Sequence, residues 1–102
     1  MQTSQAKVAA FITETSLAAD PAARLLDLQS ELGELAKEYL TASDYGLQDF
    51  APNAAWSHEI GDVAFCLLAL AAATEVDLQA ALDAALAKYQ TRLANKGSAG
   101  SA

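Results

Sequence analysis

The spacing of apolar residues predicts helices along most of the chain. Val8, Phe11 and Ile12 recur at helical spacing in a first segment of about 2–18. Two later segments carry longer stripes, in which a leucine or tyrosine returns every three or four residues. The stripes consist of Leu25, Leu28, Leu32, Leu35 and Tyr39, and of Leu78, Leu82, Leu86, Tyr89 and Leu93. With a third helix between them, this pattern predicts an all-α protein that resembles a four-helix bundle.

Residues with capping chemistry mark where these helices begin. Asp20 before Pro21 is typical of a helix start, with the aspartate as N-cap and the proline at the first helical position. Asn53 can cap a third helix that ends near residue 73, and Asp77 a fourth that ends near residue 95. The segment 41–53 is rich in turn formers and is predicted to be a loop.

The composition fits one helical domain that associates with further copies. The chain has 102 residues, 53% of them hydrophobic, which suits a single all-α domain over 1–96 and a flexible tail over 97–102. Residues 63–73 are apolar on every side, so this part of the third helix needs cover all round. We therefore predict a homodimer or a dimer of dimers. The alternative is that alanine-rich faces are tolerated at the surface.

Charge and hydropathy exclude some partners. The formal net charge of -7 leaves no basic stripe for a nucleic-acid polymer. The longest apolar run, 63–73, is shorter than the about 20 residues that cross a bilayer, and no signal peptide is visible. We therefore expect no membrane partner and a cytoplasmic location. The single cysteine, Cys66, is interpreted as a small buried residue.

Two short motifs repeat the order acid, aliphatic, glycine, acid, aliphatic. They are ELGEL at 31–35 and EIGDV at 59–63. Residues three apart in a helix lie within about 60° of each other, so each motif places its two acids on one face, beside an apolar stripe. Glycine costs about 1 kcal/mol inside a helix relative to alanine. We interpret Gly33 and Gly61 as positions that let two facing backbones approach.

If the second and third helices pack together, four carboxylates converge: Glu31, Glu34, Glu59 and Asp62. Such a cluster is stable when cations fill it, and an all-oxygen ligand set selects a hard ion such as Mg²⁺. Mg²⁺ typically takes a few carboxylates and keeps waters and substrate phosphates as its other ligands. The sequence therefore predicts a Mg²⁺ site at this cluster.

These residues resemble the ExxE…ExxD signature of the all-α nucleoside triphosphate pyrophosphohydrolases, and the chain is most similar to a short MazG-type protein. The resemblance runs from about Leu25 to Leu93 and includes a KxxxR element at Lys88 and Arg92. It implies the fold of that superfamily, four acids that hold Mg²⁺, and a basic pair that contacts phosphates. The implied reaction is hydrolysis of a nucleoside triphosphate to its monophosphate and pyrophosphate.

Four further residues are candidates for substrate contact or catalysis. Lys88 and Arg92 lie four apart on one helix face and can grip phosphate oxygens, or they form an ordinary basic helix end. Glu38, one turn beyond Glu34, either orients the attacking water or is solvated. Trp56 stacks on a base or packs beside the loop. Many members of the family that the chain resembles carry a lysine and an asparagine where this chain has Ala55 and Leu86. Because these contacts to phosphate and base are missing, the alternative function is a metal-binding or nucleotide-binding helical module without turnover.

Overall fold

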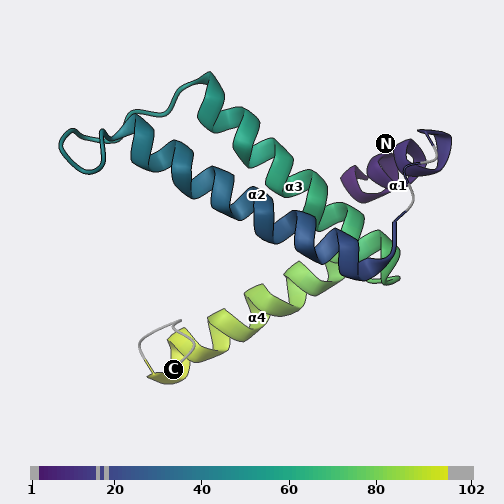
Figure 1. Ribbon diagram of the computed structural model, residues 1–102. Helices are drawn as coiled ribbons and strands as arrows, with labels where there is room; N and C mark the ends of the chain where they lie inside the picture. The colour runs from purple at the N-terminus through teal and green to yellow at the C-terminus, as the bar shows by residue number, and fades with distance from the viewer. Residues whose placement is uncertain (1–2, 16, 18, 97–102) are drawn as a thin grey trace.

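The computed structural model describes residues 3–15, 17 and 19–96, which form four α-helices (Figure 1). They are α1 (Ser4–Thr15), α2 (Pro21–Ala42), α3 (Ala54–Ala73) and α4 (Leu78–Lys96). The described residues contain no strand, which confirms the all-α prediction. The predicted tail over 97–102, and residues 2, 16 and 18 of the predicted first helix, lie outside the described residues. Thr3 and Leu17 are described and are not helical, so the first helix is shorter than predicted.

The three predicted N-caps form the expected hydrogen bonds. In each cap, a side-chain oxygen accepts a hydrogen bond from the backbone N–H of the residue three positions later. The pairs are Asp20 with Ala23 at 2.8 Å, Asn53 with Trp56 at 2.9 Å, and Asp77 with Ala80 at 3.1 Å. These bonds satisfy donors that a helix start leaves without an intrahelical partner, so the starts follow from local chemistry.

α2 ends later than predicted. Its last turn continues to Ala42 and includes the first two residues of the predicted loop. Ser43 ends it: its N–H donates to the Tyr39 carbonyl at 3.0 Å, and its hydroxyl accepts from the Gly46 N–H at 3.3 Å. Residues 44–46 then take left-handed φ values of 48°, 55° and 90°. The buried Ser43 thus joins the helix end to a tight turn.

α2 and α3 form an antiparallel hairpin, and α1 packs against the C-terminal part of α3 (Figure 1). The rings of Phe11 and Phe65 meet edge to face at 6.0 Å between centroids, and Ala69 is buried. α4 extends away from the hairpin. Its start is tied to α1 by Gln5, which accepts from the Leu78 N–H at 2.8 Å and donates to a carbonyl of the preceding turn.

The single chain buries little apolar surface. Among the described residues, Ala69 and Ala71 are the only buried hydrophobic side chains. The α4 stripe is largely uncovered: Leu82, Leu86, Tyr89 and Leu93 are 41–56% exposed. The Cα radius of gyration is 16.7 Å, against about 13 Å for a compact domain of this length. The four helices are consistent with a helical bundle, but α4 does not pack onto the hairpin within one chain.

α3 is more apolar than the other helices. By length and composition alone, its 20 residues could cross a membrane, although the 63–73 run considered by itself is too short. The helix also carries Glu59 and Asp62, and it packs along α2. A core helix of a water-soluble protein satisfies the same test, so this finding is weak evidence for a membrane span.

Candidate functional site

Three of the predicted acids meet where α2 faces α3. One carboxylate oxygen from each of Glu31, Glu59 and Asp62 lies within 4.8 Å of the other two. Glu31 comes from α2 and the other two from α3, so the antiparallel hairpin creates this acidic triad. Glu31 and Glu59 are half-buried, and Asp62 is exposed. The triad therefore has an open side toward solvent.

The remaining two acids of the prediction lie around the triad. Glu34 is exposed and does not join it, although Glu59 and Asp62, which have the same spacing on α3, both do. Glu38 is half-buried, one turn further along α2. Both still act electrostatically on Glu59. The structure thus brings three acids together and leaves Glu34 and Glu38 as charged neighbours.

The environment of Glu59 disfavours its ionised form. The pKa of this carboxyl is raised above its usual value of 4.5, first by burial and then by the charges of neighbouring acids. These acids are Asp62, Glu31, Glu34 and Glu38. All four charged groups that shift this pKa are carboxylates, and each of them disfavours the Glu59 anion.

The raised pKa of Glu59 predicts a pH-dependent effect of Glu59→Gln on the stability of the metal-free protein. A carboxyl whose pKa is raised on folding favours the folded state when protonated, and this contribution is lost as pH rises above 4.5. Glutamine stays neutral, so the variant should melt at a higher temperature than the wild type at neutral pH. The difference should shrink at pH 4.5 and below.

Thermal unfolding in the presence of a chelator, at several pH values, measures this difference. Glu14→Gln is the matched control, because Glu14 is an exposed glutamate of α1. A melting temperature of Glu59→Gln that is equal to or below that of the wild type at neutral pH would contradict the prediction.

The two motif glycines do not serve the α2–α3 contact. A Cβ added at Gly33 or at Gly61 would meet no heavy atom within 4 Å. The expectation that they let the facing backbones approach is therefore wrong for this pair of helices. Both glycines are exposed, and each lies about 200° round its helix from the first acid of its motif, so neither shares the face of Glu31 or Glu59.

The basic pair lies apart from the triad. Lys88 and Arg92 flank the ring of Tyr89 on α4, with the Lys88 Nζ 5.0 Å and the Arg92 Cζ 5.9 Å from its centroid. Neither is among the groups that shift the pKa of Glu59. Because α4 diverges from the hairpin (Figure 1), one chain does not bring this pair to the acids.

Trp56 belongs to an aromatic cluster at the loop end of the hairpin. Its ring meets Phe50 edge to face at 4.9 Å and Tyr39 at 6.0 Å, and Tyr39 stacks on Phe50 at 4.4 Å. This is the packing alternative considered for Trp56, and it fixes α3 to α2 one turn before Glu59. Stacking of Trp56 on a base stays a prediction.

Cys66 follows the triad along α3 and is half-buried. Burial raises the pKa of this thiol, and the carboxylates of Glu31, Asp27 and Asp62 raise it further, while Arg24 opposes them. The position of Arg24 was not predicted. It is buried in α2, one turn before Leu28 of the apolar stripe, and that placement is the sequence signal for it.

No protein-family model, curated protein or solved structure matches this chain.

Proposed function

We propose that this chain is a Mg²⁺-dependent nucleoside triphosphate pyrophosphohydrolase of the MazG type. The observation that supports this most is the triad of Glu31, Glu59 and Asp62, with oxygens within 4.8 Å of one another on two facing helices. Water adds to the phosphoanhydride, and the products are a nucleoside monophosphate and pyrophosphate. The matched spacing of the two acid motifs and the resemblance to the pyrophosphohydrolase signature also support it.

The donor set fits a hard divalent cation. Mg²⁺ binds oxygen ligands at about 2.0–2.1 Å. The triad oxygens lie within 4.8 Å of one another, so an ion placed between them would draw the three carboxylates closer together. The charged groups that act on Glu59 are all carboxylates, so a cation relieves their repulsion. Glu31, Glu59 and Asp62 would hold the ion, with Glu34 as a further ligand.

Each group of the chain then has a defined task. Mg²⁺ held by Glu31, Glu59 and Asp62 would neutralise charge on the phosphate oxygens and lower the pKa of a bound water. Glu38, half-buried one turn from Glu34, orients the attacking water by accepting a hydrogen bond from it. Because Asp62 is exposed, the triad is open to solvent on that side, where the phosphate chain can approach. Trp56 lies at the loop end of the hairpin, one turn before Glu59, and contacts the base of the nucleotide.

The phosphate-binding part of this proposal requires a second copy of the chain. Lys88 and Arg92 lie on α4, which diverges from the hairpin and keeps its leucine stripe exposed. Packing of this stripe against another copy would cover it and complete a bundle, and it would bring a basic pair next to an acidic triad. We therefore propose a homodimer, or a dimer of dimers, in which α4 completes the site.

The exposed face of α3 supports the same assembly and gives a test. Ile60, Ala64 and Leu67 lie one turn apart on one side of the helix, and all are exposed. Leu67→Lys would place a charge in the proposed contact, so it should convert the oligomer to monomer at micromolar concentration. Sedimentation velocity of the wild type and the variant measures this.

The control for that experiment is Gln29→Lys, which introduces the same residue at an exposed polar position of α2. It should leave the wild-type assembly intact. A wild-type protein that sediments only as a monomer at micromolar concentration would contradict the proposed oligomer.

Pyrophosphate release from a panel of ribonucleoside, deoxynucleoside and modified triphosphates, with and without Mg²⁺, tests the activity. We expect release from at least one member of the panel and none after chelation. Nucleotide binding without release from any member would favour the alternative, a helical binding module that has lost turnover. We further propose that the protein acts on the cytoplasmic nucleotide pool, with α3 as a core helix of the oligomer and no membrane or nucleic-acid partner.

A further inference from the structure

Arg24 is a buried cation with no anionic partner among the residues that the structure describes. It is 8% exposed and is the only buried charged residue among those that the structure describes. Its Nη2 donates a hydrogen bond to the Leu17 carbonyl, and it forms no ion pair with any other described residue. Burying a charge that is not paired is costly, and the chain around it is acidic. Arg24 is therefore suited to binding an anion.

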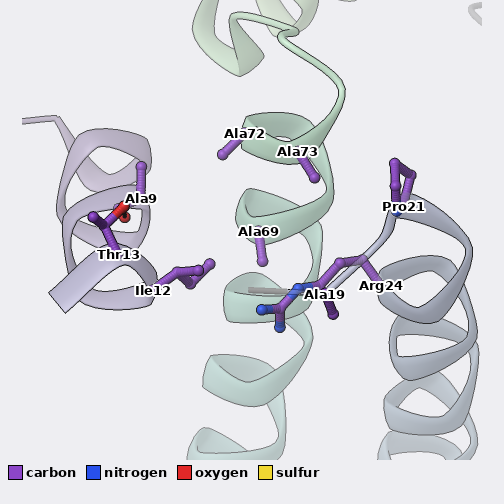
Figure 2. A pocket seen from close by; sticks show the side chains of 9 residues that line it. All are labelled: Ala9, Ile12, Thr13, Ala19, Pro21, Arg24, Ala69, Ala72 and Ala73. Atoms are coloured by element: carbon purple, nitrogen blue, oxygen red, sulfur yellow. Dashed lines mark hydrogen bonds between the residues drawn. The ribbon is translucent and has the colours of Figure 1, made fainter. Parts of the chain in front are cut away.

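The unused donors of Arg24 remain accessible. A guanidinium has five N–H groups, and the one hydrogen bond uses a single donor. In the described part of the chain, no fully buried side-chain nitrogen or oxygen lacks a partner. The free N–H groups must therefore reach solvent, and the opening that Arg24 lines is a pocket of about 290 Å³ (Figure 2).

The rest of this pocket is mostly apolar. Figure 2 shows the Arg24 side chain running from α2 past Ala69 of α3 toward the α1 side of the pocket. Ile12 and Thr13 of α1 line that side, and Ala72 lines the α3 side. The lining thus combines one cation, one hydroxyl and small apolar side chains, at the lower end of the about 300–1,000 Å³ typical of ligand pockets.

We propose that this pocket binds a small monocarboxylate with a short apolar body. The planar guanidinium of Arg24 matches a carboxylate through paired N–H···O hydrogen bonds, and the alanine and isoleucine walls cover an alkyl chain. A phosphate dianion fits less well, since it needs more donors than one arginine and one threonine, and the chain has a net charge of -7.

This site is distinct from the acidic triad and does not depend on the proposed hydrolase activity. Arg24 and Glu31 are seven residues apart on α2, which corresponds to about 10 Å along the helix axis. A carboxylate with a few carbons cannot contact both. A ligand seated between α1, α2 and α3 also links α1 to the hairpin, so its binding is a property of the folded chain.

Methyl NMR of the full chain, labelled at its alanine methyl groups, tests the proposal. Butyrate and hexanoate are titrated in parallel with the neutral butyramide and hexanamide. We expect the carboxylates to shift the methyl signals of Ala9, Ala69 and Ala72, which line the pocket, and to leave Ala55 near the triad unchanged. The amides should bind at least about tenfold more weakly, because they lose the charge-assisted hydrogen bonds.

Two variants separate the pocket from general charge effects. Arg24→Met should raise the Kd for hexanoate at least about tenfold, whereas Lys37→Met, which removes an exposed charge from the same helix, should not change it. Ala72→Leu keeps Arg24 and fills the pocket, so it should also abolish binding even if Arg24→Met fails to fold. Equal binding of acids and amides would overturn the proposal. So would shifts at Ala55 in place of the pocket alanines, or unchanged binding by Ala72→Leu.

Discussion

Asp62→Asn should lower pyrophosphate release by more than about 100-fold, because residues that only support metal ligands already contribute about 10–100-fold. Asparagine has the shape of aspartate but loses the charge that Asp62 brings to the triad with Glu31 and Glu59. Without that charge, neither water activation nor charge neutralisation at the phosphates is supported. Steady-state kinetics with the preferred nucleotide measures the loss.

Two comparisons show whether this loss is specific. Asp83→Asn changes an exposed acid of α4 whose side chain accepts a hydrogen bond from Gln79, and it should keep full activity. Lys88→Ala should mainly raise KM, because Lys88 supplies one of several phosphate contacts and Arg92 remains one turn away. Full activity in Asp62→Asn would rule out the proposed mechanism.

Mg²⁺ should raise the melting temperature of the wild type by roughly 10–20 °C at 100 times its Kd. Binding to the folded state at that concentration contributes about 2.7 kcal/mol, and about 1 kcal/mol shifts Tm by 4–8 °C in a domain of this size. The binding also relieves the repulsion that raises the pKa of Glu59. Thermal unfolding over a Mg²⁺ titration measures the shift.

Glu59→Gln should lose most of this Mg²⁺-dependent rise, since it removes one of the three triad carboxylates. Glu14→Gln, on α1, should keep it. An unchanged wild-type melting temperature at millimolar Mg²⁺ would contradict the metal site, as would an equal rise in the wild type and Glu59→Gln.

The helix starts could be predicted because their signals are local. Asp20, Asn53 and Asp77 each accept from a backbone N–H three residues later, so a few neighbouring residues determine the outcome. The end of α2 is harder to predict from the sequence. It depends on Ser43, whose hydrogen bonds reach both back into the helix and forward into the left-handed turn.

The candidate site could be predicted only in part, because spacing does not fix the rotation of one helix against another. The motifs place Glu31 and Glu34 on one side of α2, but the packing of α3 selects Glu31 for the triad. Gly33 and Gly61 were assigned to a backbone contact that does not exist between these helices.

Periodicity likewise shows which face of a helix is apolar but not what covers it. The stripe of α4 was identified from the sequence, yet α4 leaves the hairpin and carries Lys88 with it. Arg24 occupies a position of the α2 stripe, but its burial depends on α1 and α3 folding over it.

The central claim is that the acidic triad supports hydrolysis of a nucleoside triphosphate between its α- and β-phosphates. Phosphorus NMR of a mixture of nucleoside triphosphates, incubated with the full chain and Mg²⁺, tests this most directly because each possible product has its own signal. We predict that pyrophosphate and a nucleoside monophosphate appear together in equal amounts, and that neither appears with Asp62→Asn. Formation of a nucleoside diphosphate and orthophosphate, or recovery of every triphosphate unchanged, would contradict the account.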